Sequence, residues 1–228
     1  MSYKIKEFSV DFDITFLHTS EVHIVTFDAL IEELDPNLAI KHIVKPEYLQ
    51  VAITQGVSKE LEQSIQQTLC TLSQNTRVVV CTCSTIGSIA ESVKLEQGGV
   101  QRVDRAMADW AVQHGKAILI IAALTSTLTP THDLLRSSAL KHGLEVHIDQ
   151  HCVDSAWPLF ESGRYSEYLK HIAVEITNKS EGYDVIVLAQ ASMAGVMDIT
   201  DNITPIVSSP RLGVLSAIKA VNEHLNKG

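Results

Sequence analysis

The stretch at residues 77–81, which is apolar without interruption after Arg77, constrains the fold of this chain more than any other. Three valines and Cys81 follow one another there, with no alternation of polar and apolar residues. Strands of a parallel sheet carry such runs because helices bury both of their faces. A helical pattern begins shortly after Cys83, and Ser88 and Glu91 within it have the spacing of a capping box. The run therefore predicts a buried strand that passes directly into a helix.

A second run of the same construction lies at residues 184–188. Asp184 begins it as Arg77 begins the first run, and three β-branched residues follow in each. Cys83 lies six residues after Arg77, and Gln190 lies six residues after Asp184. The spacing predicts that Cys83 and Gln190 hold equivalent positions in two repeated α/β units.

Each run also has an upstream companion, a strand that ends in hydroxyl residues. Thr19 follows the companion strand of the first half, and Thr125 follows that of the second. Thr19 and Cys83 are 64 residues apart, while Thr125 and Gln190 are 65 apart. We therefore expect these four residues to converge on one pocket, with Thr19 and Thr125 as counterparts.

Strands and helices alternate along the remainder of the chain, a pattern typical of parallel sheets covered by helices. The predicted fold class is α/β, with two pseudo-symmetric lobes and an active-site cleft between them. Residues 1–113 are expected to form the first lobe and residues 114–209 the second. A closing helix at residues 210–228 is expected to pack back on the first lobe. Ligands of open α/β sheets bind at the carboxyl ends of the strands, where the candidate residues fall.

Composition and charge exclude several classes of partner. The chain has 228 residues, enough for two small lobes with cores of their own. Its formal charge of −9 argues against nucleic acid or an anionic membrane, because both require clustered Lys and Arg. No apolar run approaches the ~20 residues of a membrane span. The N-terminus lacks a signal-peptide core and the four cysteines are not arranged as a disulfide framework, so we expect a cytoplasmic protein. A homodimer is the default expectation for such an enzyme.

Cys83 is the strongest candidate for chemistry. A thiol at the carboxyl end of a strand lies beside the positive end of the next helix, which we expect to lower its pKa toward a reactive thiolate. Cys81 lies deeper in the same strand, so Cys83 is expected to be the reactive thiol of the two. The alternative is that both are small buried hydrophobic residues, as free cysteines usually are.

Hydroxyl residues gather just past the predicted strand ends. Hydroxyls and loop amides at helix starts hold a carboxylate without an arginine, although the same residue types also cap helices. The candidate substrate-binding residues are Thr19, Ser20, Ser84, Thr85, Thr125, Ser126, Thr127 and Ser192.

Metal and nucleotide sites have no support in the sequence. Cys81-x-Cys83 lacks a second ligand pair, and no two histidines have the spacing of a His-Glu-x-x-His motif. Glycine-rich dinucleotide and nucleoside triphosphate motifs are also missing. We therefore expect neither a metal nor a cofactor. Arg102, Asp104 and Arg105 follow a glycine pair and are within reach of the crevice, although a solvated helix start is the favoured expectation.

These motifs resemble the aspartate/glutamate/hydantoin racemase superfamily over most of the chain. Cys83-Ser84-Thr85 is similar to the first Cys-Asn-Thr motif of that family, and the segment around Thr125 is similar to its threonine-rich substrate loop. Residues 184–193 resemble the strand that carries its second catalytic cysteine. The resemblance implies two α/β lobes around a cleft, and two thiols that exchange a proton on opposite sides of an α-carbon without metal or pyridoxal phosphate.

The chain departs from the family at the second thiol, where Gln190 stands in place of cysteine. An amide neither takes nor gives a proton at neutral pH, so a symmetric two-thiol racemisation is not available. Cys83 remains as a one-sided acid/base, with Gln190 as its hydrogen-bonding partner across the cleft. The family includes single-cysteine decarboxylases and dicarboxylate isomerases. The expected activity is therefore proton transfer at the α-carbon of a small carboxylate or amino acid, of the isomerase or lyase type.

Two alternatives stay open on the sequence. The first is a non-catalytic small-molecule binding protein that kept the cleft and lost the chemistry. The second is a racemase whose second base is not a cysteine, with His18 and Asp104 as the nearest candidates.

Overall fold

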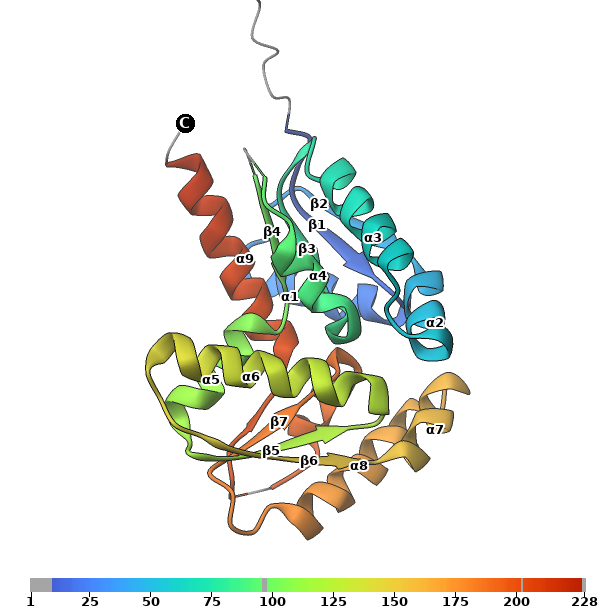
Figure 1. Cartoon of the computed structure of the whole chain (residues 1–228), viewed down its shortest axis with the longest axis vertical. Coiled ribbons are helices and arrows are strands. Elements are labelled where there is room, and N and C mark those ends of the chain that lie inside the picture. Colours follow the sequence, from blue (N-terminus) through green and yellow to red (C-terminus); the bar gives the residue numbers. More distant parts are fainter. Residues whose placement is uncertain (1–9, 96–97, 202, 227–228) are drawn as a thin grey trace, which may run out of the picture.

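The computed structural model describes residues 10–95, 98–201 and 203–226. They form two α/β lobes, stacked one above the other in Figure 1, each built on a four-stranded parallel sheet. In the first sheet the strand order is β2-β1-β3-β4, and in the second it is β6-β5-β7-β8. The strands are β1 (Phe12–His18), β2 (Ile40–Val44), β3 (Thr76–Cys81), β4 (Gly99–Arg102), β5 (Ala117–Ala122), β6 (His147–Cys152), β7 (Val185–Leu188) and β8 (Ile206–Val207). The predicted fold class is confirmed.

The helices connect these strands in the same sequence in both halves. The α-helices of the first half are α1 (Val22–Leu34), α2 (Pro46–Gln55), α3 (Lys59–Leu72), α4 (Gly87–Ser92) and α5 (Arg105–His114). Those of the second half are α6 (Leu128–His142), α7 (Trp157–Glu161), α8 (Tyr165–Lys179) and α9 (Ser209–Leu225). Short 3-10 helices follow four strands: η1 (Ser84–Ile86), η2 (Thr125–Thr127), η3 (Asp154–Ala156) and η4 (Ala191–Asp198).

Both faces of each sheet are buried, which explains why the central strands carry unbroken apolar runs. On β3, Val79 and Cys81 face a cluster completed by α2, α3 and α4, while Val78 and Val80 face one completed by α1 and α9. In the second sheet, β5 and β7 alternate in the same way between the helices α5 and α6 on one face and α8 on the other.

The two lobes exchange helices. Helix α5 follows β4 in the chain but packs on the second sheet, where Met107 and Ala111 lie in the cluster around Ile118 and Val185. Helix α9 follows β8 and packs back on the first sheet through residues such as Val214, as Figure 1 shows. The predicted lobe boundary between residues 113 and 114 separates the strands of the first sheet from those of the second. It assigns α5 to the first lobe, however, although this helix packs on the second sheet.

The strand registers define which residues of the two lobes are equivalent. Leu17 pairs with Cys81 in the first sheet, and Ile121 pairs with Leu188 at the same place in the second. Counting two residues onward from these pairs aligns Cys83 with Gln190, as the spacing predicts.

The expected match of Thr19 with Thr125 is wrong. From the same strand registers, the counterpart of Thr19 is Ala123, two residues before Thr125. The segment between the two strands differs in length between the halves, so equal sequence spacing did not correspond to equal positions in space.

The sequence analysis does not identify two of the four edge strands or helix α2. Strands β4 and β8 are short, and β4 begins at a glycine. Residues 46–55 form helix α2 with proline in its first turn. The expected capping box is also wrong. Helix α4 already begins at Gly87, and Glu91 pairs instead with Arg105.

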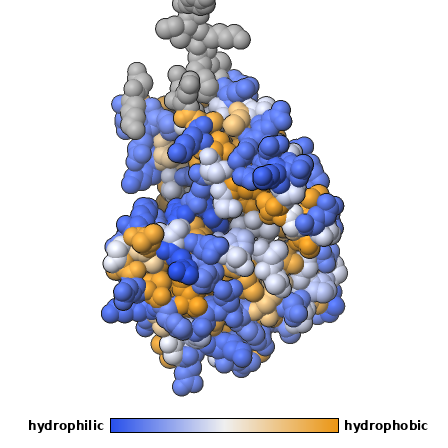
Figure 2. All heavy atoms as spheres, in the orientation of Figure 1, coloured by the Kyte–Doolittle hydropathy of each residue, from blue (hydrophilic) through white to orange (hydrophobic). Residues whose placement is uncertain are grey.

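The outer surface carries no signature of a membrane span. In Figure 2 hydrophilic residues cover much of the visible face, and hydrophobic residues lie among them in separate groups. Within the described residues, no helix combines the length and the apolar character needed to cross a bilayer.

Gly213 on α9 tests the exchange of helices. A Cβ at this position would overlap both the side chain and the carbonyl oxygen of Val103, which precedes α5. Because the obstacle includes backbone, we expect Gly213→Ala to lower the free energy of unfolding by about 1–3 kcal/mol, the usual cost of overpacking. Urea denaturation followed by circular dichroism measures this cost. Leu215→Ala, on the exposed side of the same helix, is the control and should change stability by less than about 0.5 kcal/mol. Equal effects of the two substitutions would contradict the close packing.

Candidate functional site

A small cavity of about 40 Å3 lies between the lobes, at the carboxyl ends of both sheets. Its walls come from the loops that follow β1, β3, β5 and β7 and from helices α2 and α7. The lining residues of the first lobe are Thr19, Ser20, His23, Leu49, Thr82, Cys83, Ser84 and Thr85. Those of the second lobe are Leu124, Thr127, Trp157, Phe160, Gln190, Ala191 and Ser192. The cavity is therefore shared between the two halves of the repeat.

Cys83 and Gln190 line this cavity from opposite lobes. Each is the extended residue between a central strand and a 3-10 helix, with φ and ψ of −100° and 115° at Cys83 and of −124° and 139° at Gln190. The matching backbone explains how one sequence pattern delivers both side chains to the same place.

Burial raises the pKa of the half-buried Cys83 thiol above its usual value. The Thr19 hydroxyl and the amides of Thr85 and Ile86 hydrogen-bond to the sulfur, which lowers its pKa but does not outweigh burial. The expectation of a lowered pKa is therefore wrong, because desolvation of the thiolate exceeds the stabilisation from the local amides. At neutral pH Cys83 is a thiol, poised to donate a proton.

Cys81 is not available for chemistry. Its side chain is fully buried in the apolar cluster under α2, α3 and α4, and its sulfur faces the carbonyl oxygen of Cys83 at 3.8 Å. Burial raises its pKa to about 12. Of the two cysteines, only Cys83 lines the cavity.

Gln190 is held by one end of its amide. Its Oε1 accepts a hydrogen bond of 2.7 Å from the backbone N–H of Ala123, the positional counterpart of Thr19. Its Nε2 is buried and has no hydrogen-bond partner. The Ala123 contact fixes the orientation of the amide, so the unpaired end is the donor.

The structure places eight of the ten predicted site residues in the wall of the cavity. Thr125 and Ser126 are not among them. Thr125 is exposed, with its hydroxyl 3.6 Å from the sulfur of Cys152, and the Ser126 hydroxyl is buried without a partner. The loop after β5 aligns with the loop after β1 such that Ala123 matches Thr19. Thr125 and Ser126 therefore lie two residues beyond the positions that Thr19 and Ser20 occupy in the first lobe.

Some hydroxyls of the wall are already engaged. The Ser192 hydroxyl lies 2.9 Å from that of Tyr168, and Thr127 donates to the carbonyl oxygen of Leu124 at 2.7 Å. The Thr85 hydroxyl is buried and unpartnered. Thr85 and Gln190 are thus the wall residues with buried polar atoms that lack a partner.

Neither second base suggested by the sequence lines the cavity. His18 is fully buried, with Nδ1 2.8 Å from the Thr82 hydroxyl and Nε2 2.8 Å from Nδ1 of His42. This chain of hydrogen bonds continues from His42 to the exposed Asp28, with 2.9 Å between His42 Nε2 and Asp28 Oδ1. Burial, with smaller effects from His42 and His23, lowers the pKa of His18 to about 3, so His18 is neutral at pH 7 and both of its ring nitrogens are engaged in this hydrogen-bonded chain.

His23 lines the cavity and was missed by the sequence reasoning. It lies in the first turn of α1, and burial lowers its pKa to about 4, which leaves a neutral imidazole at pH 7. A neutral imidazole is able to accept a proton. Its position four residues after Thr19, facing the strand end from the next helix, is the signal that could have identified it.

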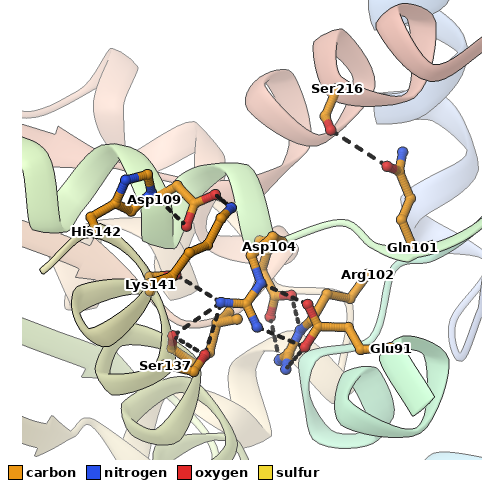
Figure 3. Close-up of polar contacts among 12 residues, drawn as sticks. Glu91, Gln101, Arg102, Asp104, Asp109, Ser137, Lys141, His142 and Ser216 are labelled. Carbon is orange, nitrogen blue, oxygen red and sulfur yellow. Dashed lines mark hydrogen bonds and ion pairs between the residues drawn. The ribbon is translucent and has the colours of Figure 1, made fainter. Parts of the chain in front are cut away.

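Arg102 and Asp104 support the site from behind. Arg102 donates Nε to Asp104 Oδ1 at 2.6 Å and Nη2 to Oδ2 at 3.1 Å, and both side chains are almost fully buried (Figure 3). A Cβ on Gly87 would meet the guanidinium at 2.8–2.9 Å, so Arg102 packs against the start of α4, just after the Cys83 loop. The expectation of a solvated helix start is wrong, because the two side chains neutralise each other.

Arg105 joins the two lobes beside this pair. It donates to both carboxylate oxygens of Glu91 on α4, at 2.6 and 2.7 Å, and to the hydroxyls of Ser137 and Ser138 on α6, each at 2.8 Å. In Figure 3, Glu91 of α4 and Ser137 of α6 mark the two ends of this bridge. The bridge holds the loop of Cys83 in place relative to the second lobe.

Metal binding has no geometric support in the part of the chain that the structure describes. No three His, Cys, Asp or Glu side chains lie close enough together there to hold an ion. Hydroxyl, thiol, amide and imidazole groups are thus the chemistry that the cavity offers.

Comparison with known proteins gives a fold. No family model and no curated protein sequence matches the chain. Solved structures do match. An aspartate racemase from Picrophilus torridus superposes with a TM-score of 0.70 at 16% identity, covering 92% of this chain and 94% of that one. Glutamate racemase from Bacillus anthracis gives 0.64 at 18% identity, covering 96% and 83%. Allantoin racemase from Klebsiella pneumoniae gives 0.59 at 17% identity, covering 94% and 89%.

This chain has the racemase fold. The match covers both lobes, so the cavity lies where two lobes of that fold meet. At these identities the similarity concerns the arrangement of the backbone, and the chemistry has to be argued from the residues of this chain.

Alkylation should distinguish the two strand-end cysteines. We expect iodoacetamide to modify Cys83 well before Cys81, with a rate that keeps rising with pH above the range where an ordinary thiol levels off, because burial raises the pKa of Cys83. Thr19→Val removes a hydrogen bond to the sulfur and should raise that pKa further, which slows the reaction at any given pH. Mass spectrometry of digested protein reads each site, with the exposed Cys70 as reference and Thr131→Val as control. Modification of Cys81 first would contradict the assignment.

Breaking the buried ion pair should destabilise the whole fold. Arg102→Met leaves the Asp104 carboxylate buried without its partner, and we expect a loss of about 3–5 kcal/mol in the free energy of unfolding, measured by urea denaturation. The matched control is Arg164→Met, which breaks an exposed pair with Glu167 and should leave the denaturation midpoint unchanged. A small effect of Arg102→Met would show that the carboxylate finds water or another partner.

Proposed function

We propose that this protein is a cofactor-independent enzyme of the racemase type, which transfers a proton at the α-carbon of a small carboxylate with Cys83 as its catalytic thiol. The observation that carries the proposal is the pairing of Cys83 and Gln190 at equivalent strand ends, facing one cavity from opposite lobes. One face of a bound α-carbon would meet a proton donor and acceptor, and the other an amide that donates a hydrogen bond.

The state of the thiol supports a one-sided reaction. Because burial keeps Cys83 protonated at neutral pH, it gives a proton to a carbanion more readily than it removes one from carbon. The Thr19 hydroxyl and the loop amides stabilise the thiolate left behind. A lyase or an exchange reaction, in which a carbanion is protonated from one face, fits this arrangement as well as an isomerisation does.

His23 favours a second candidate, a racemase with a non-cysteine second base. Its imidazole is neutral, lines the cavity and occupies the position in the first lobe that Thr127 occupies in the second. A substrate held between His23 and Cys83 would have a base on one side and an acid on the other. The third candidate, a binding protein without chemistry, would keep the cavity and show no hydrogen exchange at the α-carbon.

Hydrogen exchange at the α-carbon tests the proposal. We expect the protein to exchange the α-hydrogen of a small carboxylate with deuterated water with retention of configuration, followed by NMR. Cys83→Ala should reduce the rate by at least about 100-fold, the usual contribution of a general acid/base, while Cys70→Ser, an exposed thiol outside the cavity, should not. Aspartate and glutamate should not be racemised at rates above roughly 1 per second.

The variants separate the candidates. Gln190→Cys places a second thiol at the equivalent strand end and should convert exchange with retention into inversion. His23→Gln should leave one-sided exchange intact but abolish any inversion by the wild type. Exchange that survives in Cys83→Ala would overturn the proposal.

A further inference from the structure

A line of polar side chains lies where helix α1 packs on the first sheet, although the layer around it is apolar. His18 ends β1 and is fully buried, and His42 lies on the neighbouring strand β2. The ring centroid of Phe16 lies 5.3 Å from that of His42, and the ring centroid of Phe27 lies 5.3 Å from that of His18. Buried imidazoles need a hydrogen-bond partner at each nitrogen, so their contacts determine what this line of side chains is able to do.

The contacts form one continuous chain from the cavity to solvent. Thr82 lines the cavity, and its hydroxyl oxygen lies 2.8 Å from Nδ1 of His18. Nε2 of His18 lies 2.8 Å from Nδ1 of His42, and Nε2 of His42 lies 2.9 Å from Oδ1 of Asp28. The exposed fraction of the side chains rises along the chain, from 0% at His18 through 13% at His42 to 54% at Asp28. The chain therefore has one end at the cavity and the other in water.

One pattern of hydrogens satisfies every contact with neutral imidazoles. Thr82 donates its O–H to Nδ1 of His18, and His18 donates its Nε2–H to Nδ1 of His42. His42 then donates its Nε2–H to the Asp28 carboxylate. Each ring carries one hydrogen and accepts at its other nitrogen. Burial lowers the pKa of His18 to about 3, so this ring is neutral at pH 7, as the pattern requires.

A second pattern uses the same contacts in the opposite direction. The Thr82 hydroxyl also lies 3.2 Å from the carbonyl oxygen of Leu17, to which it donates when it accepts from Nδ1–H of His18. His18 then accepts at Nε2 from Nδ1–H of His42, which keeps its Nε2–H toward Asp28. The second pattern holds one more proton than the first, and the added charge lies on His42 beside a carboxylate.

The change from the first pattern to the second takes one proton out of the cavity. A ligand in the cavity gives a proton to the Thr82 oxygen, and Thr82 passes its own hydrogen to Nδ1 of His18. The Nε2–H bond of His18 breaks, and an N–H bond forms at Nδ1 of His42. The ligand loses one proton, His42 gains one, and nothing is oxidised or reduced. The reverse change returns a proton to the cavity.

Two rings in series keep the charge away from the buried ring. A charge on His18 would lie in an apolar layer, with the ring centroid of His23 6.2 Å away, and its desolvation would be costly. On His42 the same charge is partly exposed and lies beside the carboxylate of Asp28. His23 and Asp28 are the titratable groups that face the two rings from α1. The geometry therefore directs an added proton to the outer ring.

We propose that a proton relay between the cavity and solvent is formed by Thr82, His18, His42 and Asp28. Its acid/base group at the cavity end is the Thr82 hydroxyl. The inference rests on the proposed function for the reaction that the relay serves, because it supplies the acid/base group that Gln190 does not. His18 and His42 are positioning residues that act through Thr82, in the way that an oriented base acts on a hydroxyl.

Nitrogen NMR of the histidine side chains in the full-length protein distinguishes the two patterns. At about pH 8 we expect the hydrogen of His18 on Nε2. As the pH falls toward about 5, His42 should take up a proton and His18 should move its hydrogen to Nδ1 with the same midpoint, because one pattern replaces the other. Rings that titrate independently would overturn the relay, and so would a His18 that keeps its Nε2–H throughout.

Variants of Thr82 test the cavity end of the relay. Thr82→Val removes the acceptor for Nδ1–H of His18, so we expect the proton affinity of His42 to fall at least about tenfold, a shift of about one pH unit in the midpoint. Thr82→Ser keeps the hydroxyl and should keep the wild-type midpoint. Thr131→Val removes a buried hydroxyl of α6 outside the cavity and should leave the midpoint unchanged. Circular dichroism identifies a variant that has unfolded. An unchanged midpoint in folded Thr82→Val would overturn the relay.

Hydrogen exchange in deuterated water, with glutamate and succinate as probes, separates this inference from the proposed function. Thr82→Val and His42→Phe should each slow the exchange at least about tenfold, whereas His147→Phe, at an exposed histidine of β6, should not. Exchange that requires Cys83 but neither Thr82 nor His42 would support the proposed function and overturn the relay. A coupled titration of the two rings without exchange of either probe would support the relay and contradict the proposed function.

Discussion

Each sheet of this protein must be buried on both faces, and neither lobe does so with helices from its own part of the chain alone. The central strands carry no polar face that tolerates water, so every exposed side of a sheet needs a helix. Helix α5 covers the second sheet and α9 covers the first, and each comes from the opposite half of the chain. This exchange ties the lobes together and brings the carboxyl ends of both sheets to the same cavity.

The buried pair of Arg102 and Asp104 stands where the chain crosses from one lobe to the other. A charged pair in such a place is weak evidence for stability, since two hydrophobic residues often do as well. Its geometry does place the guanidinium against Gly87, directly after the Cys83 loop. The segment that crosses between the lobes is therefore packed against the end of the Cys83 loop, and we expect a substitution in one to alter the conformation of the other.

The pseudo-symmetry of the backbone is broken by the side chains of the cavity. Equivalent strand ends carry a thiol in one lobe and an amide in the other, and the first lobe contributes more hydroxyls to the wall than the second. The backbone is therefore pseudo-symmetric, whereas the side chains of the site are not.

The sequence by itself determined the α/β class, the repeat and the equivalence of Cys83 and Gln190, because β-branched runs and their spacing are local properties that burial imposes on a strand. It did not determine the pKa of Cys83, which follows from how far the closed cavity excludes water. The sequence analysis paired Thr19 with Thr125, because a count of residues takes no account of the different length of the segment between the two central strands in each half. It also could not identify His23, the unpartnered amide of Gln190 or the buried ion pair. Contacts between residues far apart in the chain decide these, and only the packing of two lobes brings them together.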